Sequence, residues 1–221
     1  MLNEQIHIAK YNKIKYCTNM FSLSNCNARN CLNKALSFRD NCITHLKDRN
    51  SYIKEIHEYF QKERELKDLE LTGITLKDLT LNSKAFKYCN MSQVVFENVN
   101  IKDSELYLSY FDFCIFKNCT FTKIDCNFIC FAGSQINNCK YTDSELLRCN
   151  FVGIKAEDLL FESCDLYSSR FINSLLTRVK YDDCNLKSVR FEHSTLNNVT
   201  YPSCNAEEAF FREGAEYNEI L

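Results

Sequence analysis

A repeat of five residues constrains the fold of this chain more than any other feature of its sequence. From Leu71 to Phe211, every fifth position holds a large apolar residue, with few exceptions such as Cys126. Two positions earlier, a second series holds small or β-branched residues such as Val99 and Ser104. The helical period of 3.6 and the strand period of 2 do not produce this pattern. A fixed period indicates a repeat architecture, in which each unit buries its apolar residues against its neighbours.

Several pentapeptides carry a resemblance to a known family. They read as a small residue, then Asp, Asn or Thr, then Leu or Phe, then two further residues, as in Cys119–Lys123, Cys149–Gly153, Cys164–Ser168 and Cys184–Ser188. This pattern resembles the pentapeptide-repeat family over about two thirds of the chain. The resemblance implies a mainly β fold, a right-handed quadrilateral β-helix with four pentapeptides per coil. Residues 66–211 then form about seven coils.

A coil of twenty residues can be tested within the sequence. One set with this period consists only of phenylalanines: Phe111, Phe131, Phe151, Phe171, Phe191 and Phe211. A second consists of phenylalanine and tyrosine: Phe121, Tyr141, Phe161, Tyr181 and Tyr201. Stacked side chains of one kind, about 4.8 Å apart, are what a solenoid of short strands is expected to contain.

The ends of such a solenoid expose apolar side chains and unpaired strand edges, so caps are expected. Residues 1–65 form a polar leader, in which apolar residues near helical spacing predict a cap helix at about 43–65. A weaker pattern at 28–39 is compatible with another helix, one that buries Cys31, Leu32, Ala35, Leu36 and also Phe38. Residues 212–221 form a C-terminal tail or second cap. Some similar proteins dimerise at this end, so a monomer and a C-terminal dimer both stay open.

Composition narrows the class of protein. No apolar run approaches the roughly 20 residues that span a bilayer, and the amino terminus lacks the layout of a cleaved export signal. Residues 66–221 carry sixteen Lys and Arg against twenty-two Asp and Glu, whereas residues 1–65 carry eleven against seven. An acidic rod disfavours direct nucleic-acid binding, because such binding needs Lys and Arg to neutralise phosphates.

Fourteen cysteines would suit a disulfide scaffold in a small secreted protein. Most of them instead occupy the inward small-residue series: Cys89, Cys114, Cys119, Cys139, Cys149, Cys164, Cys184 and Cys204. Buried cysteine behaves as a small apolar residue. We therefore expect reduced thiols and a reducing cytoplasm. The inward series also contains Lys84, where we expect a distorted coil that lets the ammonium reach solvent beside the cap.

No motif of a known catalytic site appears, and the inward cysteines have no base near them, so we expect no enzyme activity and no cofactor. Cys26, Cys31, Cys42 and His45 contain the residue types of a zinc site. Their spacing lacks the paired C-x-x-C of structural zinc, so no metal is assigned to them.

The outward residues supply the candidate binding surface. At a period of twenty, one column is acidic throughout: Glu105, Asp125, Glu145 and Asp165. Like charges stacked on adjacent strands repel, although the family consensus places Asp or Asn here in any case. Round the next corner, we expect an apolar stripe that includes Tyr107, Leu108 and Tyr167. Such a stripe suggests an interface, unless the amino-terminal segment covers it.

Two functions follow as expectations. The first is a non-catalytic scaffold that binds a partner protein through the solenoid faces, with a bacterial effector secreted into host cells as one version. The second is a DNA mimic that binds a type II topoisomerase such as gyrase, since the chain resembles quinolone-resistance pentapeptide proteins in length and acidity. Those proteins usually begin the repeat near the amino terminus and carry loops between coils, and this chain does neither.

Overall fold

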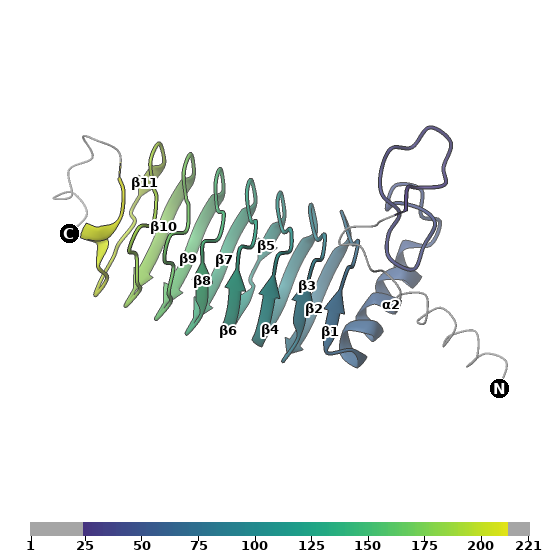
Figure 1. Cartoon of the computed structure of the whole chain (residues 1–221), viewed down its shortest axis with the longest axis horizontal. Coiled ribbons are helices and arrows are strands. Elements are labelled where there is room, and N and C mark those ends of the chain that lie inside the picture. The colour runs from purple at the N-terminus through teal and green to yellow at the C-terminus, as the bar shows by residue number, and fades with distance from the viewer. Residues whose placement is uncertain (1–23, 212–221) are drawn as a thin grey trace.

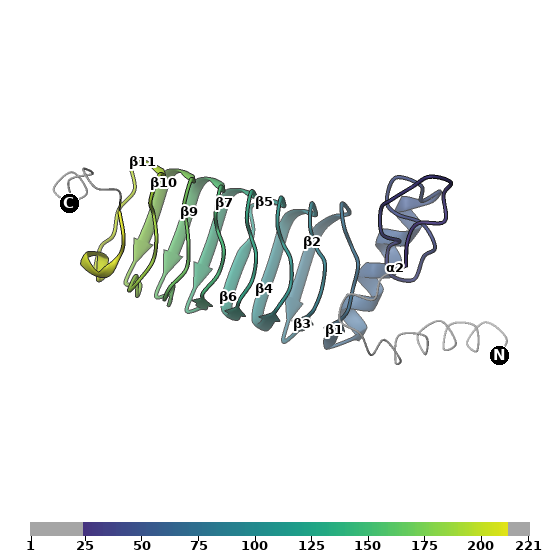
Figure 2. The same cartoon turned by 45° about the horizontal axis from the view of Figure 1, so that its top comes forward.

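The computed structural model describes residues 24–211, and these form a rod of stacked strands with one helix at its N-terminal end (Figures 1 and 2). The helix is α2 (Arg49–Lys62), and a short 3-10 helix, η2 (Ala206–Glu208), lies near the other end. The strands are β1 (Glu65–Lys67), β2 (Thr75–Asn82), β3 (Ala85–Lys87), β4 (Val95–Tyr107), β5 (Ile115–Lys117), β6 (Thr120–Asn127), β7 (Gln135–Thr142), β8 (Glu145–Leu147), β9 (Lys155–Glu162), β10 (Leu175–Asp182) and β11 (Thr195–Asn197).

Strand pairing confirms coils of twenty residues. Each strand pairs in parallel with the strand one coil further on, as Leu66 does with Phe86 and Tyr141 with Phe161. Both periodic series point inward, so two residues in every five are buried along most of the rod. The solenoid has about seven coils, as the sequence predicted.

The corners between pentapeptides need a left-handed backbone. A residue with positive φ recurs every five positions along the solenoid, and many of these residues are Asn, Asp, Ser or Gly. Asn and Asp tolerate this conformation better than other residues with a Cβ. At one corner the side chains also join the coils, because Asn118 donates to Asn98 (3.1 Å) and Asn138 donates to Asn118 (2.8 Å).

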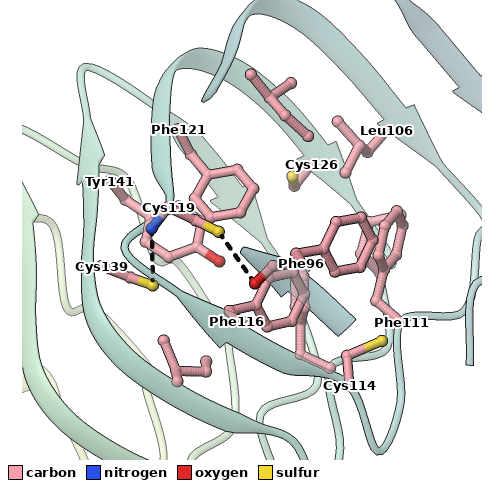
Figure 3. Packing of buried hydrophobic residues seen from close by; sticks show 14 of the residues in the cluster. Phe96, Leu106, Phe111, Cys114, Phe116, Cys119, Phe121, Cys126, Cys139 and Tyr141 are labelled. Atoms are coloured by element: carbon pink, nitrogen blue, oxygen red, sulfur yellow. Dashed lines mark hydrogen bonds between the residues drawn. The ribbon is translucent and has the colours of Figure 1, made fainter. Parts of the chain in front are cut away.

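The core is built from aromatic ladders. The Phe151 ring stacks between Phe131 and Phe171, with centroid distances of 4.8 and 4.7 Å. In the second ladder, Tyr141 stacks on Phe161 at 5.0 Å. Figure 3 shows how the rings of successive coils fill the interior together with cysteine side chains. The phenylalanine ladder predicted from the period of twenty is therefore present.

The thirteen cysteines of the described chain are all free thiols, and most of the repeat cysteines are buried. The Cys119 thiol donates to the carbonyl of Phe96 (3.6 Å), and the Cys119 N–H donates to the Cys139 sulfur (3.4 Å; Figure 3). Burial raises the pKa of Cys149 to about 12. These cysteines therefore serve as small buried core residues, as expected.

The cap helix is shorter than the predicted 43–65. Helix α2 begins after Asp48, whose carboxylate accepts from the Ser51 N–H (2.9 Å), and it ends at Lys62. An N-cap aspartate satisfies an otherwise unpaired N–H, which fixes the start of a helix. The Phe60 ring meets Phe86 of the first coils edge to face at 6.0 Å, so the helix covers the end of the core. None of the helices in the described chain is long and apolar enough to cross a membrane.

The predicted helix at 28–39 is wrong. These residues form turns, with one antiparallel bridge between Asn25 and Lys34, and Leu32 is 93% exposed. Asn30 and Asn33 lie in this segment, and asparagine side chains compete with the helical hydrogen bonds. Asn30 adopts a φ of 61°. The expected burial of Ala35 and Leu36 is correct.

Lys84 lies beside the cap as expected, but its coil is not distorted. Strands β2 and β3 keep their twenty-residue register with β4. The Lys84 ammonium donates to the carbonyl oxygens of Glu63 (2.8 Å) and Gln61 (3.4 Å), at the end of α2. A lysine at this position satisfies carbonyls that the helix leaves unpaired. The expectations for residues 1–23 and for the tail at 212–221 lie outside the described residues.

The Phe151→Ala variant should lose about 3–5 kcal/mol of unfolding free energy, because it removes a central ring of the ladder. Denaturant unfolding of the purified protein measures this loss. The matched control is Phe128→Ala, which truncates the same side chain where it is 52% exposed. That change should cost no more than about 0.5 kcal/mol. Equal losses in the two variants would contradict the stacked core.

Native thiol labelling should spare Cys114, Cys119, Cys139, Cys149, Cys164 and Cys184, because all six are buried. Cys130 is an internal positive control, since it faces outward and is only partly covered. Mass spectrometry after short exposure to an alkylating reagent reads out each site. Rapid modification of most of the six in folded protein would refute their inward orientation.

Candidate functional site

The acidic column predicted from the sequence is a true stack. Glu105 pairs with Asp125 across β4 and β6, and Asp125 pairs with Glu145 of β8. An isolated bridge continues the column from Glu145 to Asp165. Four carboxylates on adjacent coils therefore follow one line along the rod.

Three of these four carboxylates have no partner within residues 24–211. Glu105, Asp125 and Glu145 are exposed, and none makes an ion pair or hydrogen bond through its side chain there. Asp165 differs, because its carboxylate accepts from the Tyr167 N–H (2.9 Å) and from the side-chain amide of Asn185 (2.9 Å). The Asp165 carboxylate therefore has hydrogen-bond partners in its own coil and in the next one. The unpaired acidic surface of the described chain consists of the other three carboxylates.

Several acids elsewhere on the rod are paired with bases about one coil away. Lys77 binds Glu97 (2.5 Å), Lys140 binds Glu162 (2.6 Å), and Arg178 binds Asp158 (2.7 Å). These ion pairs offset the repulsion that stacking would otherwise create. The column of Glu105, Asp125 and Glu145 has no such compensation in the described chain, which sets it apart.

The aromatic side chains lie on the same face as the acidic column, and not round the next corner as the sequence analysis expected. Glu105 and Tyr107 flank the buried Leu106 in β4, and alternate residues of a strand point to the same side. Tyr107 is 40% exposed and meets Tyr88 edge to face, with 5.9 Å between ring centroids. The acidic and aromatic columns are therefore two edges of one surface.

Arg148 is part of this surface, although sequence reasoning did not select it. Its guanidinium lies 5.6 Å from the ring centroid of Phe128 and 5.8 Å from that of Tyr167, which is cation–π geometry. The signal was present in the sequence, because Arg148 shares a period-twenty column with Leu108 and Phe128. We call the set of Glu105, Asp125, Glu145, Tyr107, Leu108, Phe128, Arg148 and Tyr167 the acidic–aromatic face.

Bulky apolar residues occupy left-handed corners on and beside this face. Leu108, Phe113 and Phe128 have φ of 43°, 54° and 56°, a conformation that bulky side chains rarely adopt. Phe128 is 52% exposed and Phe113 is 62% exposed. Burial within the described chain therefore does not offset the strain of placing large rings at these two corners.

A second group of polar residues lies in the turns before α2. The ligand atoms of Cys26, Cys31, Cys42 and His45 lie within 4.8 Å of one another. Burial raises the pKa of the Cys42 thiol, but N–H donors of His45, Asn33 and Thr44 outweigh it and bring this pKa to about 6. The structure thus brings together four residues whose spacing led the sequence analysis to assign no metal.

No model of a known protein family matches the chain, and no curated protein matches it in sequence. Solved structures do resemble it. A trypsin-treated form of QnrB1, a plasmid-mediated fluoroquinolone resistance protein, is 14% identical over 66% of this chain and 74% of its own, with a TM-score of 0.39. HetL, a pentapeptide-repeat protein involved in heterocyst differentiation regulation in the cyanobacterium Nostoc sp. strain PCC 7120, is 10% identical over 73% and 97%, with a TM-score of 0.30.

Rfr23, a pentapeptide-repeat protein from the cyanobacterium Cyanothece 51142, is 14% identical over 72% of this chain and 99% of its own, with a TM-score of 0.23. Likeness at these levels carries no information about function. The five-residue repeat, the coils of twenty residues and the parallel stacked strands give the chain the fold of the pentapeptide-repeat proteins.

Proposed function

We propose that this protein is a non-catalytic scaffold that binds a partner protein through the acidic–aromatic face. The observation that carries the proposal is that unpaired, stacked carboxylates and exposed aromatic rings share one surface. Repulsion within the column of Glu105, Asp125 and Glu145 is offset when a basic partner binds. Exposed tyrosine and phenylalanine beside charge are typical of the residues that anchor protein interfaces.

The face also suggests what kind of partner it fits. The carboxylates follow one another at the strand spacing of about 4.8 Å, which suits Lys or Arg side chains of a segment lying along the rod. The rings of Tyr107 and Phe128 offer apolar contact next to this line. Exposed complementary charges are screened by salt, so the affinity should fall as ionic strength rises.

Two versions differ in where the scaffold works. In one, it acts in the reducing cytoplasm of the cell that makes it; in the other, it is a bacterial effector that acts inside a host cell. Free thiols along the whole described core are compatible with both, because both compartments are reducing.

A second candidate function is a DNA mimic that binds a type II topoisomerase. The observation in its favour is the line of three unpaired carboxylates, which would stand in for backbone phosphates. Against it, Arg148 lies on the same face between Phe128 and Tyr167, and a cation there interrupts an anionic surface. The mixed character of the face favours a protein partner that offers aromatic or acidic groups to Arg148 as well as basic groups to the carboxylates.

The test uses tagged full-length protein and lysates of the source organism and of candidate host cells. The double variant Asp125→Lys/Glu145→Lys should lose a partner that the wild type retains, and the wild type should lose it at high salt. The matched control is Glu207→Lys, which reverses an exposed acid near the other end of the rod. This control should bind as the wild type does.

A melting curve of each variant separates binding from folding. The single variant Asp125→Lys should melt at the same temperature as the wild type or higher, because it replaces two repulsive contacts by attractive ones. Unchanged capture by the double variant would mean that the face is only a solvated surface. Inhibition or protection of gyrase supercoiling by the wild type alone would favour the DNA mimic, and no effect on gyrase favours the scaffold.

A further inference from the structure

The turns before α2 gather three sulfur atoms and one imidazole in a single cluster. Cys26, Cys31, Cys42 and His45 come from a segment that the structure holds in turns, and their ligand atoms all lie within 4.8 Å of one another. We propose that these four residues form a structural zinc site that fixes the segment over the cap helix.

Three distances within the cluster match those of a tetrahedral site. Zinc bonds of about 2.3 Å to sulfur and about 2.0 Å to nitrogen place two sulfurs about 3.8 Å apart and a sulfur and a nitrogen about 3.5 Å apart. The Cys31 and Cys42 sulfurs are 3.8 Å apart. The Nδ1 atom of His45 is 3.6 Å from the Cys26 sulfur and 3.4 Å from the Cys42 sulfur. Three thiolates and one imidazole are a common ligand set of structural zinc.

Backbone N–H groups point at the three sulfurs. Ala28 donates to Cys26, Asn33 to Cys31 and Thr44 to Cys42, in each case from two residues further along the chain. The side-chain amides of Asn41 and Asn33 add donors to Cys26 and Cys42, both at 3.7 Å. Hydrogen bonds of this kind stabilise a sulfur that carries negative charge, and they are the outer contacts that orient metal ligands.

The cysteines of the solenoid provide an internal comparison. Cys114 donates its thiol proton to the carbonyl oxygen of Met91 (3.0 Å), and Cys89 donates to that of Leu66 (3.2 Å). Within residues 24–211, no sulfur of the cluster has a carbonyl acceptor of this kind. These solenoid cysteines are therefore placed as thiol donors to carbonyl oxygens, whereas the cluster sulfurs face one another and the His45 imidazole. A zinc ion binds such sulfurs as thiolates, so each thiol releases its proton to solvent when the metal binds.

The spacing of the four ligands along the chain also fits a structural zinc site, when they are taken as two pairs. Cys26 and Cys31 have four residues between them, and Cys42 and His45 have two. Ligand pairs separated by two to four residues are usual in structural zinc sites. The absence of C-x-x-C therefore does not exclude zinc here, because a pair of cysteines is followed by a cysteine–histidine pair.

A metal ion at this site would stabilise a segment that has little secondary structure and few buried side chains. Residues 24–48 contain one isolated bridge and no helix or longer strand, and few of their side chains are buried. This segment lies beside α2 (Figures 1 and 2) and contacts both the helix and the first coil. Ser37 exchanges two hydrogen bonds with Glu70, both 2.8 Å, and Arg39 forms an ion pair with Glu55 of α2. Metal binding supplies folding free energy to a small region without a core of its own.

A disulfide is the competing explanation of the cluster. Cys31 and Cys42 are close, but their sulfurs are 3.8 Å apart, whereas a disulfide needs about 2.05 Å. A bond between them would also leave His45 and Cys26 with no role. Because the two explanations predict different masses and metal contents, one preparation distinguishes them.

The first experiment measures metal in the full-length protein, purified under reducing conditions without chelator. We expect one equivalent of zinc per chain, and on replacement by Co²⁺ the absorption bands of a tetrahedral, thiolate-bound ion. Cys42→Ser and His45→Ala should each lower zinc affinity by at least about tenfold. The matched control is Cys130→Ser, which removes an outward thiol of the solenoid and should keep full zinc content.

The second experiment locates the effect of the metal by hydrogen exchange. Removing zinc from the wild type with a chelator should speed amide exchange in residues 24–48 and at the start of α2, and leave the central coils unchanged. Readdition of zinc should restore protection. The proposal is overturned if the reduced wild type takes up neither zinc nor cobalt, if Cys42→Ser keeps full metal content, or if native mass spectrometry finds a Cys31–Cys42 disulfide in its place.

Discussion

Parallel pairing of residues twenty apart, through backbone hydrogen bonds between neighbouring coils, is the constraint on which the rest of this structure depends. Parallel pairing in a fixed register places each side chain on its counterpart in the next coil. Phenylalanine therefore stacks on phenylalanine in the core, and asparagine donates to asparagine at the corners. The same register places Asp125 between Glu105 and Glu145, where stacking is unfavourable. The twenty-residue register thus stabilises the interior. It also makes a surface column that is unfavourable for stability recognisable, because its like residues stack directly on one another.

Because of this register, each surface column can be compared with the composition that would be most stable there. A column of like charge would be relieved by one lysine in the next coil, and this relief occurs at Glu97 and Glu162. A left-handed corner is favourable with Asn or Gly, yet Phe128 occupies one while half exposed. Both departures from the stable pattern meet on the acidic–aromatic face. Their coincidence on one surface is the physical argument for a binding role.

Most of the solenoid could be predicted from the sequence, because the register of its coils appears there as a period of five and twenty residues. The ladder of Phe131, Phe151 and Phe171 and the inward cysteines follow from that period alone. The features that could not be predicted depend on contacts between residues of different columns, or between the solenoid and the segment before it. The side on which Tyr107 lies follows from strand alternation within β4, and the contacts of Arg148 follow from two neighbouring columns. Lys84 was read as a defect because its acceptors belong to a helix outside the repeat.

The leader was the least predictable part, because nothing in it repeats. A periodic pattern suggested a helix at 28–39, whereas the asparagines and the antiparallel bridge favour turns. A solenoid needs an end that stops strand addition, and α2 covers that end with Phe60 against Phe86. A single amphipathic helix of fourteen residues is marginal by itself. Lys84 holds it from the solenoid side and the turns hold it through Arg39 and Glu55. The stability of the cap therefore depends on whatever orders those turns, and the four residues best placed to do so are Cys26, Cys31, Cys42 and His45.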